Sequence, residues 1–193
     1  FKLVFLGSDI NFEEKGYAFF FFSLEDLDEE YAKQMDLVLT VRSSEHAEMY
    51  RMLKHFRSVQ IINGYTHDDL PQIFEGASLS IVPVLWEDNL PQIAIESVAY
   101  GVPVLASTAG GAKELCDSEL FQFACADAED LRNKLIYFLD HPEQLDLYWK
   151  HHHGLVTMQQ HWQELSGIYG IQKKGNVELS YEDYHSLLRE HEF

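Results

Sequence analysis

Apolar residues along this chain fall into six short runs that are separated by amphipathic stretches. The runs are nearly continuous rather than alternating, which is typical of strands in a sheet that is covered on both faces. We expect strands at residues 1–7, 36–41, 58–63, 79–85, 102–107 and 120–124. The stretches between them repeat apolar positions at helical spacing, and they predict helices at residues 15–33, 45–56, 68–76, 90–100 and 129–140.

Alternation of strands and helices with short connections predicts an α/β fold. We expect a doubly wound parallel sheet of about six strands with helices on both faces, which binds its ligand at the carboxyl ends of the strands. Residues 1–170 are predicted to form this domain, and two further helices follow the breaks at Pro142 and Gly154. Residues 171–193 are predicted to be a linker and a short C-terminal helical tail.

Composition and charge narrow the possible functions. The 193 residues suffice for one domain with a substantial core, and the formal net charge of −18 argues against a nucleic-acid partner. No apolar run approaches the length that crosses a bilayer. The two cysteines, Cys116 and Cys125, lack the spacing of a redox or zinc motif, which favours reduced thiols in the cytoplasm. A chain that begins at Phe1 without Met is expected to be a fragment of a longer protein.

The segment 80–115 carries the most informative polar pattern. Asp88 precedes the helix expected at residues 90–100, and Glu96 lies about a turn and a half inside it. The free backbone N–H groups near residues 90–93, together with the helix dipole, can bind an anion, which makes Asn89, Leu90 and Pro91 candidate binding residues. The alternative is an ordinary helix start capped by Asn89, with Glu96 facing solvent because glutamate favours helices.

Two glycine-containing turns are further candidates. Gly64 and Tyr65 follow the third expected strand, where the tyrosine ring can stack on a planar ligand; the alternative is a helix entry capped by Thr66. Gly110 and Gly111 follow the fifth expected strand, where glycine permits close approach of the backbone to a ligand, or else forms a plain turn.

These residues together resemble a known family. Its hallmark is two acids with seven residues between them, then small helical residues, Gly-x-Pro-Val and a Gly-Gly turn. Here the two acids are Asp88 and Glu96, and they are followed by Ala99, Gly101, Pro103, Val104, Gly110, Gly111 and Glu114. The pattern resembles the C-terminal, donor-binding domain of GT-B retaining glycosyltransferases of family 4, also called group 1. The resemblance is strongest over residues 59–115, weaker over 1–58 and 116–170, and absent after about 171.

The resemblance implies a Rossmann-like half of a GT-B fold and a UDP- or GDP-sugar as donor. It implies that Asp88 accepts hydrogen bonds from the sugar and that Glu96 holds the ribose hydroxyls. Lys15 would neutralise the diphosphate, and Tyr65 would contact the base. The acceptor, a glycan or lipid-linked molecule of polysaccharide synthesis, would bind through a separate N-terminal domain. The full-length protein would then be cytoplasmic or peripheral to the membrane.

Departures from the family pattern keep other functions open. The first acid is Asp rather than Glu, and the Arg that usually precedes Lys15 is missing, with Arg42 as a conceivable replacement. A non-catalytic GT-B-like interaction domain and half of a sugar-nucleotide epimerase therefore remain alternatives. A nicotinamide-binding domain is disfavoured because the loop after the first strand lacks Gly-x-Gly-x-x-Gly. The resemblance implies no metal requirement, so we expect neither a metal nor a cofactor.

Overall fold

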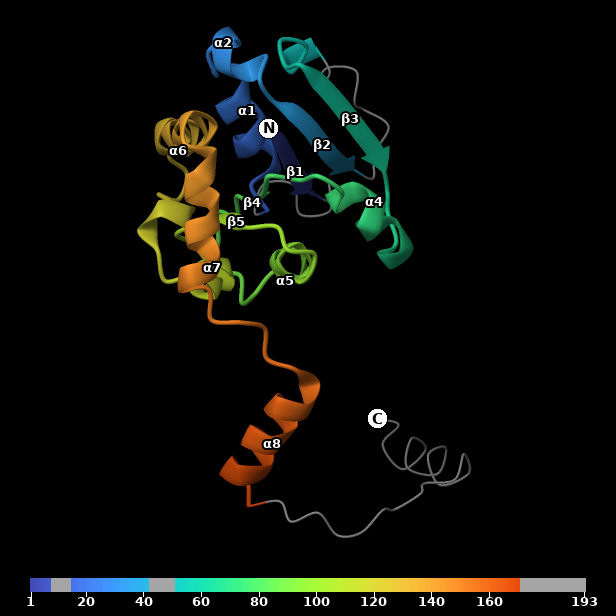
Figure 1. Ribbon diagram of the computed structural model, residues 1–193, viewed down its shortest axis with the longest axis vertical. Helices are drawn as coiled ribbons and strands as arrows, with labels where there is room; N and C mark the ends of the chain where they lie inside the picture. The colour runs from blue at the N-terminus through green and yellow to red at the C-terminus, as the bar shows by residue number, and fades with distance from the viewer. Residues whose placement is uncertain (8–14, 42–50, 171–193) are drawn as a thin grey trace. The chain divides into compact units, whose positions relative to one another are not determined.

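The structure, a computed structural model, describes residues 1–7, 15–41 and 51–170. All six predicted strands are present and run parallel in one sheet of order β3-β2-β1-β4-β5-β6 (Figure 1). The strands are β1 (Lys2–Leu6), β2 (Asp36–Val41), β3 (Ser58–Asn63), β4 (Leu79–Val82), β5 (Val104–Ser107) and β6 (Gln122–Phe123). The predicted doubly wound α/β fold is therefore confirmed.

The strand order places a reversal between β1 and β4. The first three strands add in one direction from β1, and the next three add on its other side, where Leu3 pairs with Leu79. Loops leaving β1 and β4 at their carboxyl ends diverge to opposite faces, which opens a crevice between them. In a sheet of this kind the reversal is the expected place for a ligand.

Alternating side chains of β1 divide the core into two layers. Leu3 and Phe5 belong to the larger cluster, which also receives α1 (Tyr17–Glu25) and α6 (Ala128–Asp140). Val4 and Leu6 belong to a smaller cluster with α4 (Leu70–Phe74). Both faces of β1 are thus buried, which explains why its sequence is continuously apolar.

The helices differ from the prediction in detail. The single helix expected at residues 15–33 is wrong, because the structure has two helices there, α1 and α2 (Glu29–Ala32). The carboxylate of Asp28 accepts a hydrogen bond from the backbone N–H of Glu30 and so starts the second helix. The first half of the helix expected at residues 45–56 lies outside the described residues, and in the second half residues 51 and 52 are helical.

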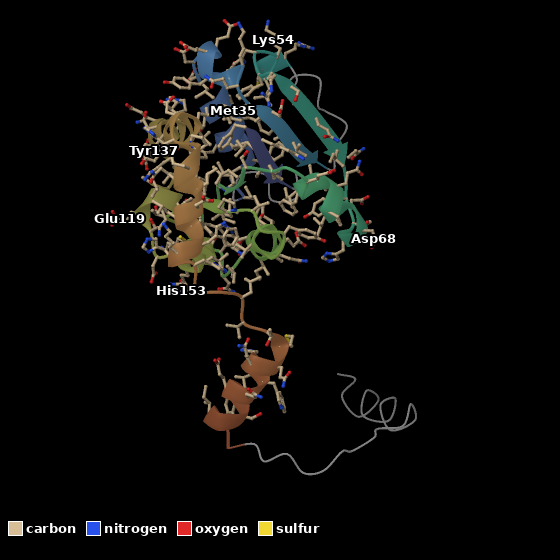
Figure 2. All side chains as sticks on the ribbon, viewed as in Figure 1. Met35, Lys54, Asp68, Glu119, Tyr137 and His153 are labelled. Atoms are coloured by element: carbon tan, nitrogen blue, oxygen red, sulfur yellow. The ribbon has the colours of Figure 1, made fainter. Side chains whose placement is uncertain are left out.

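After β3 the chain forms η1 (His67–Asp69), α4 and later α5 (Gln92–Ala99). The C-terminal part contains the 3-10 turns η2 (Gly111–Leu115), η3 (Glu119–Phe121) and η4 (Pro142–Asp146) and the helices α7 (Leu147–His151) and α8 (Met158–Ile168). Figure 2 shows Met35 inside the body that carries the sheet, with Asp68 and Glu119 at its surface on opposite sides.

The chain divides into two compact units, of which the first comprises Phe1–Leu155 and the second begins at Val156. Helix α8 lies in the second unit and starts with a capping box between Thr157 and Gln160. The predicted domain boundary at residue 170 stays a prediction, and the predicted tail lies outside the described residues. Across residues 1–7, 15–41 and 51–170, no helix combines the length and the apolar character needed to span a membrane.

Candidate functional site

A pocket of about 210 Å³ lies at the carboxyl ends of β1 and β4, where the strand order reverses. Both strand ends contribute to this pocket, together with the start of α5, Tyr65 after β3 and Lys15 before α1. The lining residues are Phe5, Leu6, Gly7, Lys15, Tyr65, Val82, Pro83, Val84, Pro91, Gln92 and Ile93. The fold thus brings the predicted residues Lys15, Tyr65 and Pro91 to one cavity.

The predicted pair Lys15 and Asp88 forms an ion pair at the edge of this pocket. Lys15 Nζ lies 2.5 Å from Asp88 Oδ2, although the two residues are 73 positions apart in the chain. Their side chains are 35% and 17% exposed, so the pair is half-buried. The sequence did not single out Trp86, whose ring centroid lies 5.6 Å from Lys15 Nζ.

Gly16 explains how Lys15 reaches this place. Its φ of 72° is left-handed, and a Cβ there would lie 1.7 Å from the carbonyl oxygen of Pro83. Only glycine allows the start of α1 to sit directly against the end of β4. The Lys-Gly pair therefore positions a cation beside the loop that carries Asp88.

Glu96 is buried, with 9% of its surface exposed. Its Oε1 accepts a hydrogen bond of 2.9 Å from Gln92 Nε2 and lies 3.6 Å from His67 Nδ1. Its Oε2 is buried, and no donor among the described residues contacts it. Sequence reasoning missed the roles of Gln92 and His67, although the four-residue spacing of Gln92 and Glu96 on a helix was a usable signal.

The start of α5 differs from the alternative interpretation, in which Asn89 caps an ordinary helix start. Pro91 occupies the N-cap position with φ −57° and ψ 131°, and no described side chain caps the helix. A capping side chain must belong to the N-cap residue itself, and Asn89 lies two residues earlier, so the Asn89 cap is wrong. Pro91 lies one position before the first helical residue, and the first-turn N–H groups have no side-chain cap.

Gly110 and Gly111 lie under the loop that carries Asp88. The Gly111 N–H donates a 2.8 Å hydrogen bond to the Asp88 carbonyl oxygen. A Cβ on Gly110 would lie 2.8 Å from that oxygen, and one on Gly111 would lie 1.7 Å from the Asn89 oxygen. The predicted close approach therefore occurs between two loops of the protein, and contact with a ligand stays a prediction. A second hollow of about 440 Å³ is lined by Glu87, Asp88, Asn89, Leu90, Gly110, Gly111, Lys113 and Glu114.

The two residues predicted after β3 separate in the structure. Tyr65 lines the pocket at the strand-order reversal, whereas Gly64, with φ 71°, lines another hollow beside Gln60. The predicted helix entry is confirmed, because the Asp69 carboxylate accepts 2.8 Å hydrogen bonds from Thr66 N and Thr66 Oγ1. The backbone hydrogen bond from Thr66 lowers the pKa of Asp69 below its ordinary value.

The fold and this site define a class of protein: a Rossmann-like domain whose reversal-point pocket is lined by a lysine and by an uncapped helix start. Neither predicted acid lines this pocket; Asp88 contacts the lining residue Lys15, and Glu96 contacts the lining residue Gln92. The family described as Glycosyl transferases group 1 matches residues 1–141, and the chain belongs to it. Among curated proteins, none matches the sequence significantly.

Solved structures with this fold include GT-B glycosyltransferases. The catalytic domain of cholesterol-alpha-glucosyltransferase from Helicobacter pylori has a TM-score of 0.59 and 17% identity, over 78% of this chain and 96% of that chain. Anabaena HepE in complex with UDP has a TM-score of 0.65 and 15% identity, over 89% of this chain and 49% of that chain. Sucrose-phosphate synthase from Thermosynechococcus elongatus has a TM-score of 0.63 and 19% identity, over 89% of this chain and 46% of that chain. The chain thus spans about half the length of the last two and shares the GT-B sugar-transferase fold.

Proposed function

We propose that this chain is the donor-binding half of a retaining glycosyltransferase that uses a nucleoside-diphosphate sugar. Membership of the glycosyltransferase family and the reversal-point pocket support this assignment. HepE, which shares the fold, has been solved with UDP and with UDP-glucose, and this favours a uridine nucleotide over a guanosine nucleotide.

The unpartnered carboxylate oxygen of Glu96 carries the proposal. A buried charged oxygen without a hydrogen-bond donor costs free energy, so proteins rarely keep one without a use for it. Ribose presents two adjacent hydroxyls, and a carboxylate can accept hydrogen bonds from both. Since Oε1 already contacts Gln92, a ribose would supply the donor that Oε2 lacks.

The other residues have complementary roles in this proposal. Lys15 and the N–H groups at the start of α5 stabilise the diphosphate as it leaves with negative charge. Asp88 accepts hydrogen bonds from the transferred sugar, and Tyr65 contacts the base. This set requires neither a metal nor a cofactor. A glycan or lipid-linked acceptor binds through a second domain, so this chain alone binds nucleotide and transfers little.

Calorimetric titration tests the proposal with UDP, GDP and ADP in the presence of a chelator. We expect one of them to bind, and Glu96→Ala to weaken that binding by about 1–3 kcal/mol, the loss expected for hydrogen bonds to a charged group. Glu119→Ala, which removes an exposed acid on η3, is the matched control and should leave affinity unchanged. Equal affinities for wild type and Glu96→Ala would contradict the ribose assignment.

The ion pair between Lys15 and Asp88 favours a second candidate, a non-catalytic interaction domain. Because the Lys15 ammonium is already paired with Asp88, it attracts a phosphate less strongly. Absence of binding by all three nucleotides at millimolar concentration would support that candidate and overturn the first.

A further inference from the structure

We propose that Asp88 regulates access to Lys15, so that the site favours a nucleotide carrying its sugar over the bare nucleoside diphosphate. This inference rests on the proposed function and deepens it. In the structure the Asp88 carboxylate forms an ion pair with the Lys15 ammonium. A diphosphate must compete with Asp88 for that ammonium, and only a ligand that also supplies donors to Asp88 makes the exchange favourable.

The geometry shows how closely the two groups are held. Lys15 Nζ and Asp88 Oδ2 are 2.5 Å apart, a charge-assisted contact in a half-buried position where solvent screens it less than at the surface. The Trp86 ring lies on the same ammonium at 5.6 Å from its centroid. The cation that borders the pocket is therefore already occupied from two sides.

The described residues that line the reversal-point pocket and the hollow of about 440 Å³ offer little other positive charge. Besides Lys15, the lysine lining them is Lys113, and its Nζ donates to the carbonyl oxygen of Thr108 at 2.6 Å. Glu87 and Glu114 add negative charge to the second hollow. An incoming diphosphate thus depends on Lys15, and at Lys15 it meets the like charge of Asp88.

The backbone of Asp88 is hydrogen-bonded to the glycine turn, whereas its carboxylate contacts Lys15. Gly111 N–H holds the Asp88 carbonyl oxygen at 2.8 Å, and Gly110 and Gly111 leave no space for the loop to sink further. A change of partner at Asp88 therefore requires a rotation of the carboxylate and no movement of the loop. Sugar hydroxyls donate to that carboxylate, whereas a bare diphosphate offers acceptors only. After transfer, Asp88 would return to Lys15 and promote release of the nucleotide product.

The test compares a nucleoside diphosphate with its nucleoside, using whichever of UDP, GDP and ADP binds wild type most tightly. Asp88→Asn should tighten the diphosphate by roughly fivefold, the scale of one partly exposed ion pair, and leave the nucleoside unchanged. The gain should vanish in the Lys15→Met background, because the effect acts through that ammonium. Glu87→Gln removes a neighbouring acid of the same sign and should give less than half of the gain.

Each outcome decides between the two proposals. Unchanged or weaker diphosphate binding by Asp88→Asn, with the nucleoside still bound, overturns the competition and leaves the proposed function standing. Equal tightening of nucleoside and diphosphate also overturns it. Failure of wild type to bind either ligand overturns both proposals. Asp88→Ser, a second uncharged variant, must shift the ratio of the two affinities in the same direction as Asp88→Asn.

Discussion

Glu96 shows at the scale of one residue how a buried carboxylate disfavours folding. Its side chain is buried on α5, one oxygen contacts Gln92, and the other has no donor among the described residues. Removing a charged oxygen from water without giving it a partner disfavours folding. The residue is therefore better explained by what it binds than by what it stabilises.

Replacing this carboxylate by an apolar side chain of similar length should separate the effect of Glu96 on stability from its effect on nucleotide binding. We expect Glu96→Met to raise the free energy of unfolding by about 1 kcal/mol, because a buried carboxylate oxygen without a donor is removed and the volume is kept. The same variant should bind nucleotide more weakly than wild type. Urea unfolding at neutral pH and calorimetry on the same samples measure both quantities, and a loss of stability would show that Glu96 is a structural residue.

The sequence indicated where the candidate residues lie along the chain but did not reveal their contacts. Spacing alone placed Asp88 and Glu96 on either side of a helix start, and the structure has them there. The contact between Lys15 and Asp88 joins residues 73 positions apart, so no local pattern could reveal it. The alternative interpretation, a cap at Asn89, is wrong because Pro91 occupies the N-cap position, two residues further along the chain.

At the scale of elements, Asp36 joins the starts of β2 and β3. It accepts hydrogen bonds from Arg57 Nε at 2.8 Å and from Ser58 Oγ at 2.6 Å, and Arg57 Nη2 contacts its other oxygen. The hydrogen bonds from Arg57 lower the pKa of Asp36 from 3.8 to about 2. β3 is the outermost strand on this side of the sheet, and this cluster ties its first residue to its neighbour.

The lowered pKa of Asp36 predicts a pH-dependent contribution to stability. The carboxylate stabilises the folded state above pH 3.8, and the contribution is lost as the pH falls from 3.8 through about 2. Because the Asp36 side chain is 32% exposed, we expect only about 1 kcal/mol after allowing for solvent screening.

Asp36→Asn should therefore lower the free energy of unfolding at pH 7 and have a much smaller effect near pH 2, where the contribution of the carboxylate is mostly lost. Urea unfolding at the two pH values measures the difference. Asp68→Asn, at an exposed acid on η1, is the control and should be neutral at both. A penalty for Asp36→Asn that persists undiminished at pH 2 would mean that the cluster acts through packing.

The elements were largely predictable because each strand is a continuous apolar run between polar stretches. Where the prediction of elements failed, a local hydrogen bond overrode the apolar pattern, as at Asp28 between α1 and α2. The order of the strands was not predictable from such runs, because it depends on pairings between distant segments such as Leu3 with Leu79.

At the scale of the whole molecule, the buried core belongs to the first compact unit. The last fully buried apolar residue in the described chain is Tyr148, and α8 buries none of its side chains. An isolated helix of 11 residues is marginally stable in water. Folding and nucleotide binding should therefore depend on Phe1–Leu155.

A chain that ends after Leu155 should keep a cooperative thermal transition within about 2 °C of the longer chain, since a shift of a few degrees corresponds to about 1 kcal/mol in a domain of this size. It should also keep its affinity for nucleotide. Circular dichroism melting and calorimetry provide the measurements. A broad transition in the shorter chain would show that later residues contribute to the core.

The central position of β1 has a consequence during synthesis on the ribosome. β1, β2 and β3 emerge in order and can pair at once, but the other edge of β1 has no neighbour until β4 follows, more than seventy residues after it. Until then the edge of β1 that later pairs with β4 stays unpaired, in addition to the outer edge of β3, and Tyr17, Phe20 and Phe21 lack part of their packing. We therefore expect the same strand order that creates the crevice to make the partly synthesised chain prone to aggregation unless chaperones bind it.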